Sequence, residues 1–212
     1  MPAEKPRRNQ RARQEIAAEA ARIIATEGQR SYLLAKRKAA ERLGASTRNG
    51  LPSNSDIEQA LKEWQQLYGG GDHEENLLAL RRAALDAMRF LDRFGPRLVG
   101  PVLEGTADRF SRIRLHLFAD DPDAVVRFLM EHGIPHSQER RKVRWHDGGH
   151  RHIDVLVVET GSGIVELGLM IGPDARQPLP SPIDGRPLRR MGRSELEELI
   201  RTSRPDLPSG VR

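Results

Sequence analysis

The period of the hydrophobic and polar positions along this chain changes once, near residue 96. From Arg11 onward, apolar residues recur three, four and seven positions apart, which is typical of amphipathic helices. After Pro96, apolar and polar residues alternate, which is typical of strands with one buried face. The pattern predicts a helical first part and then an α+β part, without an internal repeat.

The first part is expected to contain four helices, which cover residues 11–27, 32–43, 55–68 and 73–94. Gly28 and Gly44 follow the first two, where a helix commonly ends. Ser55 and Glu58 fit a capping box, in which each side chain accepts a backbone N–H at the start of the helix, so the third helix is predicted to begin at Ser55. The glycines at 69–71 interrupt the pattern and are the candidate linker.

The second part alternates between strands and helices. Asp121-Pro122 is typical of a helix start, because proline is tolerated at the first helical position. We expect strands at 97–103, 111–118, 139–146, 151–158 and 163–171, and helices at 122–132 and 194–202. Glycine-containing turns between the last three strands predict a meander, and hence a mixed or antiparallel sheet flanked by helices.

Together these elements predict a disordered arm at residues 1–9, a basic helical module at 10–70, an α+β domain at 72–202 and a flexible tail at 203–212.

Composition narrows the classes of protein. The chain has 212 residues and no cysteine, which excludes a disulfide scaffold, an iron–sulfur site and a thiol nucleophile. No apolar run is long enough for a membrane span, and no apolar core follows the basic N-terminal residues, so we expect a cytoplasmic protein without a membrane partner. Residues 1–50 hold 12 basic and 5 acidic residues, a net charge of +7. This basic arm indicates an anionic partner, nucleic acid first, although a solvated helix face has the same composition.

One pair of segments carries a family resemblance. Leu98-Val99-Gly100-Pro101 is followed by Ser111-Arg112-Ile113-Arg114-Leu115. The two segments resemble the core motif of the nucleotidyltransferase superfamily, the polymerase beta-like fold, in which an apolar-Gly-Ser turn precedes Ser-Asp-x-Asp on a strand. The resemblance covers residues 75–171 and implies a nucleotidyltransferase-like mixed sheet.

The departures from the family motif change the expected chemistry. Arg112 and Arg114 stand where the family has its two metal-binding aspartates, and Pro101 stands where it has serine. Residues two positions apart on a strand point to the same side, so both guanidinium groups would meet an anion there. The resemblance therefore implies a catalytically degenerate protein that binds a nucleotide, a phosphate or a nucleic-acid backbone without a cofactor. Its expected anion-binding residues are Gly100, Gly105, Arg112, Arg114 and His116.

The family's third carboxylate has two candidates here, Glu166 and Asp154, which would be the remaining catalytic groups. One alternative is that Glu166 forms a structural salt bridge with Arg112 or Arg114. Another is an active transferase that holds Mg²⁺ on a rebuilt site of Asp120, Asp154 and Glu166.

Two further groups of residues are candidates for binding. Residues 12–46 resemble the opening of TetR-type DNA-binding domains, but a loop replaces the recognition helix. Non-specific phosphate contacts are therefore expected there, from Arg11, Arg13, Lys36, Arg37 and Lys38. A nucleic-acid-binding or interaction protein with a purely structural α+β half is thus a further alternative. His150, His152 and Asp154 could share one face of a strand, but we expect surface histidines rather than a zinc site.

Overall fold

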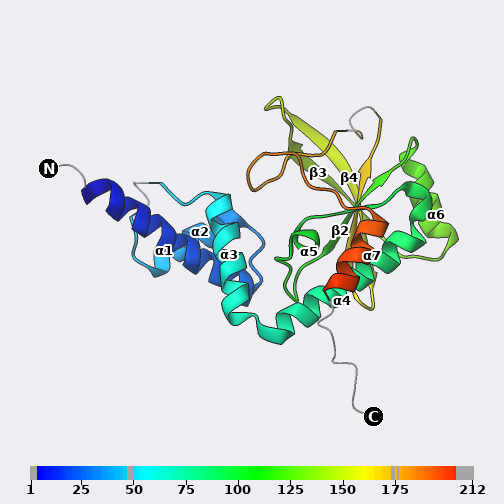
Figure 1. The fold of residues 1–212 in the computed structure, drawn as a ribbon. Helices are drawn as coiled ribbons and strands as arrows, with labels where there is room; N and C mark the ends of the chain where they lie inside the picture. The colour runs from blue at the N-terminus through cyan, green and yellow to red at the C-terminus, as the bar shows by residue number, and fades with distance from the viewer. Residues whose placement is uncertain (1–3, 47–49, 173–174, 176, 204–212) are drawn as a thin grey trace, which may run out of the picture. The chain divides into compact units, whose positions relative to one another are not determined.

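The computed structural model describes residues 4–46, 50–172, 175 and 177–203, and its secondary structure follows the change of period (Figure 1). The chain forms two compact units. The first holds the chain up to Glu74 together with residues 108–110 and 182–185, and the second holds the rest. The division after Glu74 lies inside a helix that begins at Gly70. The glycines at 69–71, the candidate linker, therefore separate two helices but do not form a loop of their own.

Three helices build the first unit: α1 (Glu4–Glu27), α2 (Tyr32–Arg42) and α3 (Asn54–Tyr68). Helix α1 contacts both of the others. Small side chains let the helices approach closely, and the fully or almost fully buried residues include Ile16, Ala20, Ile23, Ala35, Ala39, Ile57 and Leu61. Residues 4–9, expected to be disordered, are helical instead. Leu67, near the end of α3, is 75% exposed.

The start of α3 differs from the predicted capping box. The N-cap is Ser53, whose hydroxyl accepts the Asp56 N–H at 3.0 Å, while Asp56 Oδ2 accepts the Ser53 N–H at 2.7 Å. Glu58, the predicted partner of Ser55, instead accepts a hydrogen bond from the Tyr32 hydroxyl. The capping residue therefore lies two positions earlier than the sequence pattern suggested, and the helix begins at Asn54.

This difference predicts the outcome of two alanine substitutions. Ser53→Ala should lower the free energy of unfolding of the helical unit by about 1 kcal/mol, because the N–H of Asp56 loses its acceptor. Ser55→Ala, in the exposed first turn, should change it by less than about 0.5 kcal/mol. Thermal unfolding followed by helical circular dichroism measures both, and a larger loss for Ser55→Ala would contradict the cap at Ser53.

The second unit is an α+β structure around a five-stranded sheet. Its elements are α4 (Gly70–Phe90), the short helix η2 (Asp92–Phe94), β1 (Arg97–Val99), α5 (Pro101–Glu104), β2 (Ile113–Phe118), α6 (Pro122–Glu131), β3 (Ser137–Arg144), β4 (His150–Thr160), β5 (Gly163–Met170) and α7 (Arg193–Thr202). The strand order is β1-β2-β5-β4-β3. Strands β2 and β5 are parallel and the other neighbours are antiparallel, so the predicted mixed sheet is confirmed.

One predicted strand, 97–103, is wrong in its second half. Strand β1 ends at Val99, because Gly100 adopts a φ of 76° and Pro101 then begins the single turn of α5. Strand β2 also begins later than predicted, at Ile113, which leaves Arg112 just before it. Of the predicted flexible tail, 204–212 lie outside the described residues.

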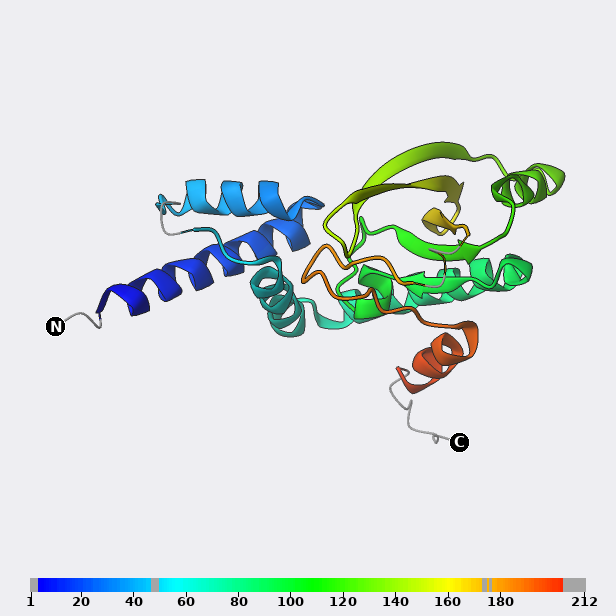
Figure 2. The ribbon, with the colours of Figure 1, turned by 90° about the horizontal axis from the view of Figure 1, so that it is seen from above.

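The main core covers one face of the sheet. Alternate residues of β2 and β5, among them Ile113, Leu115, Leu117, Val165, Leu167 and Leu169, are buried against apolar residues of α4, α5, α6 and α7. Helices α4 and α7 lie on the same side of the sheet (Figure 2). Because side chains alternate along a strand, Arg114, His116 and Glu166 must point to the opposite face.

Candidate functional site

The candidate site lies on the sheet face that the helices leave uncovered, where β2 and β5 run side by side. Arg114 and Glu166 are direct partners in the parallel register of these strands. Arg112 lies two residues before Arg114 and so shares its face. Arg141 comes from β3, two strands away, and its long side chain reaches over β4 to the same carboxylate.

Three guanidinium groups meet on Glu166, whose side chain is only 5% exposed. Arg141 forms a bidentate pair, with Nη1 at 2.7 Å from Oε2 and Nη2 at 2.8 Å from Oε1. Arg112 Nη1 donates to Oε1 at 2.8 Å, and Arg114 Nε donates to Oε2 at 3.2 Å. Arg141 also donates to Glu139 at the exposed rim. The alternative that Glu166 pairs with Arg112 or Arg114 is therefore what the structure has, with Arg141 added.

This arrangement determines the ionisation of the cluster. Burial by itself would raise the pKa of Glu166, but the hydrogen bonds from Arg141 and Arg112 and the charge of Arg114 outweigh it and lower this pKa to about 2. The hydrogen bond to Glu166 raises the pKa of Arg141. The carboxylate is thus ionised at neutral pH, and three arginines face two carboxylates, Glu166 and Glu139.

The arginines keep hydrogen-bond donors that the carboxylates do not use. Nε of Arg112 is buried and has no hydrogen-bond partner in the described part of the chain. Among the described residues, both Nη atoms of Arg114 also lack an acceptor, since only its Nε is engaged. The side chain of Arg114 is 43% exposed, so these two Nη atoms are available to a ligand from solution. Gly100 lies beneath this side chain, and a Cβ there would stand 3.5 Å from Arg114 Cδ.

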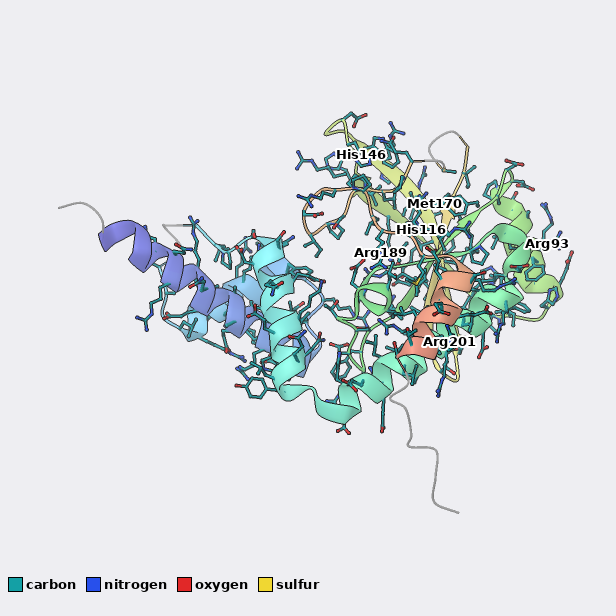
Figure 3. All side chains as sticks on the ribbon, in the orientation of Figure 1. Arg93, His116, His146, Met170, Arg189 and Arg201 are labelled. Carbon is teal, nitrogen blue, oxygen red and sulfur yellow. The ribbon has the colours of Figure 1, made fainter. Side chains whose placement is uncertain are left out.

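His116 occupies the buried end of the same face, next to Met170 (Figure 3). Its ring lies over Gly168, where a Cβ would stand 3.3 Å from His116 Cδ2. Its Nδ1 is buried and has no partner among the described residues. Burial, and then the charge of Arg190, lower the pKa of His116 to about 4, so the imidazole is neutral at pH 7.

Arg190 belongs to the segment that follows β5 and partly covers this face. Its guanidinium lies 5.0 Å from the centre of the Phe118 ring and donates to the carbonyl oxygens of Ala175 and Gln177. Burial, and then the nearby charge of Arg97, lower the pKa of Arg190. The face therefore gathers five arginines, at positions 97, 112, 114, 141 and 190, around two carboxylates.

Not every predicted site residue is brought to this face. Gly105 lies against Arg81 and Leu77, away from Glu166. Asp154 points to the opposite face, because Val155 and Val157 are the residues of β4 that share a face with Gly168 and Glu166. The register therefore contradicts a site in which Asp154 joins Glu166.

No group of three histidine, aspartate or glutamate side chains among the described residues is arranged to hold a metal ion. His150 and His152 are exposed near the start of β4, and the nearby His146 instead contacts the carbonyl oxygen of Pro178.

The predicted phosphate contacts of the helical unit are spread over its surface. Arg11 pairs with Glu15, and Lys38 pairs with Glu27. Burial lowers the pKa of Lys36, and Asp56 partly offsets this effect. Arg13 lies near Gly50. Arg37 is the fifth of the predicted phosphate contacts.

Arg141 is the principal site residue that the sequence did not indicate. It lies in the run Glu139-Arg140-Arg141-Lys142, where nothing in the sequence distinguishes one basic residue from its neighbours. The alternation of β3 could have separated Arg141 from Arg140 and Lys142, but only the strand order shows that it faces Glu166.

Comparisons with known proteins identified no relative of this chain. No protein-family model matches the chain, and neither a curated protein nor a solved structure matches it. In the described part of the chain, no helix is long and apolar enough to cross a membrane. The resemblance to nucleotidyltransferases therefore stays a prediction from the two segments that carry it.

Proposed function

We propose that this protein binds a nucleotide through its phosphate groups on the arginine-lined face, with Arg114 and Arg112 as the direct contacts. The observation that carries the proposal is the surplus of guanidinium donors around Glu166. Guanidinium groups bind phosphate oxygens through paired, charge-assisted hydrogen bonds, and Arg114 presents two unused Nη atoms to solvent.

Glu166 has a supporting role in this proposal. A buried carboxylate holds the arginines in fixed positions before the ligand arrives, which lowers the conformational entropy lost on binding. It also offsets only part of their positive charge, so a phosphate still meets a favourable field. Metal-dependent transfer is not part of the proposal, because Glu166 is occupied by three arginines and Asp154 points away from it.

Thermal unfolding in the presence of ligands tests the proposal. ATP or inorganic phosphate should raise the melting temperature without Mg²⁺, whereas adenosine, which lacks phosphate, should not. At a concentration 100 times the dissociation constant, the stabilisation would be about 2.7 kcal/mol. Arg114→Gln should remove it, because the exposed donors are lost.

Arg82→Gln is the matched control, since it removes an exposed arginine of α4 that lies away from this face. The proposal fails if neither ATP nor phosphate stabilises the wild-type protein, or if Arg114→Gln responds like Arg82→Gln. Magnesium-dependent turnover of ATP would show instead that a transferase site exists elsewhere.

A further inference from the structure

The outer half of the β3–β4 hairpin is a two-stranded ribbon that extends beyond the rest of the sheet. Residues 140–144 of β3 pair with residues 150–154 of β4. Strand β5 pairs with β4 only from Val155 onward, so no third strand among the described residues lies beside these five residue pairs. Figure 1 shows β3 and β4 continuing together to the tip of the hairpin.

The two faces of this ribbon differ in character. On one face, Val143 and Ile153 pack with the buried residues Trp145, Met170 and Leu179. Arg151 adds a contact at 4.2 Å from the centre of the Trp145 ring. An isolated hairpin is marginally stable in water, so this small core is what holds the ribbon in shape.

The opposite face is basic and open to solvent. Its residues are Arg140, Lys142 and Arg144 on β3, and His150, His152 and Asp154 on β4. All except Asp154 are exposed. Within the described part of the chain, the side chains of Arg140, Lys142 and Arg144 form neither an ion pair nor a hydrogen bond, in contrast to that of Arg141 on the other face.

We propose that this basic ribbon face binds the phosphate backbone of double-stranded DNA. The three cations stand two residues apart, which places their Cα atoms about 6.8 Å from each other in a straight row. A row of fixed cations complements the closely spaced phosphates of a duplex. The major groove of B-DNA, about 12 Å wide, admits a two-stranded β-ribbon. The face carries no phenylalanine, tyrosine or tryptophan to stack on bases, so the contacts read the backbone and not the sequence.

The ribbon face is independent of the nucleotide site, because it points to the side of the sheet away from Glu166. Either site can therefore fail without the other. The helical unit also carries basic residues, so the test must distinguish the ribbon from them.

Fluorescence anisotropy of the full chain with a labelled 20-base-pair duplex tests the inference. The combined substitution Arg140→Gln, Lys142→Gln and Arg144→Gln removes three phosphate contacts. The slope of log K against log salt should then become shallower by about 2.7, equivalent to about 40-fold in affinity between 50 and 200 mM salt. The control combines Arg82→Gln, Arg89→Gln and Arg201→Gln, which removes the same charge from α4 and α7 and should leave the slope unchanged.

Several results would overturn the inference. These are no duplex binding by the wild-type protein, equal slopes for the ribbon and control variants, and binding to anionic phospholipid vesicles but not to DNA. The ribbon variant should also keep the wild-type response to ATP. A loss of DNA binding together with a lowered melting temperature would be checked with Lys142→Gln alone, which should reduce the slope by about 0.9 without changing stability.

Discussion

Replacing Glu166 with glutamine is expected to lower the free energy of unfolding by about 3 kcal/mol, the low end of what removal of one partner from a buried ion pair costs. The substitution keeps the shape of the side chain but removes the charge that three arginines share. The low end applies because the arginines are 25–43% exposed and water screens part of their repulsion. For a chain of this size, the melting temperature should fall by about 6–12 °C.

Asp154→Asn is the matched control for this substitution. Asp154 is also an acid on a strand of the sheet, but it points to the other face, and its side chain forms no ion pair or hydrogen bond among the described residues. Its replacement should change stability by less than about 0.5 kcal/mol. Equal melting temperatures for Glu166→Gln and the wild-type protein would show that the arginine cluster does not depend on its carboxylate.

The same variant also probes the proposed binding of phosphate. Without the Glu166 charge, the positive charges of the three arginines are not compensated by an anion. Millimolar phosphate should therefore raise the melting temperature of Glu166→Gln more than that of the wild-type protein. If the cluster is only a structural salt bridge, phosphate should have the same small effect on both proteins. The destabilisation by Glu166→Gln and the stabilisation of this variant by phosphate are thus separate results.

The stability of the protein is expected to fall by about 2 kcal/mol between pH 7 and pH 5 because of His116. Burial and the charge of Arg190 lower the pKa of His116 to about 4 in the folded protein, against about 6.5 for an ordinary histidine. Below pH 6.5 the unfolded chain takes up a proton that the folded protein does not. The stabilising contribution is therefore complete above pH 6.5 and is lost as the pH falls towards 4.

Glu166 acts in a lower range of pH. Its pKa of about 2 lies below the ordinary value of 4.5, so its contribution is complete above pH 4.5 and is lost as the pH falls towards 2. The interval from pH 7 to pH 5 is consequently diagnostic of His116. Urea unfolding at several pH values across this interval measures the effect.

His116→Phe should make stability nearly independent of pH between 7 and 5, because it removes the imidazole that takes up the proton. The substitution breaks no hydrogen bond of Nδ1, which has no partner among the described residues. His152→Gln, which changes an exposed histidine of β4, should keep the wild-type dependence. A wild-type protein equally stable at pH 7 and pH 5 would contradict the burial of a neutral imidazole, and so would a His116→Phe variant that keeps the slope.

The periods of the hydrophobic positions predicted the helices and the hairpins, because these elements depend on the residue types within each segment. Glycines at 28, 44 and 133 follow helices, each with a positive φ that suits the end of a helix. Asp121 caps α6 and Pro122 takes its first position, as predicted. Alternation along β2 likewise places Ile113, Leu115 and Leu117 in the core, whereas Arg114 and His116 share the other face.

Local rules failed where two local solutions compete. Ser53 and Ser55 both fit a helix cap, and the chain uses Ser53, which forms a capping box with Asp56. Residues 97–103 alternate like a strand, but Gly100 and Pro101 turn the chain before the strand can continue. In both cases the sequence pattern fits two local structures, so the period of the pattern does not by itself decide between them.

The sequence by itself determined the α+β architecture, the faces of the strands and the placement of Arg112 and Arg114 on one side of the chain. These features depend on residue type and on periods of 2 and 3.6, which neighbouring residues set. Only the tertiary structure decided that Arg141 joins them on Glu166 and that Asp154 does not. Strand order and register govern those distances, and both arise from the burial of the whole sheet face rather than from any one segment.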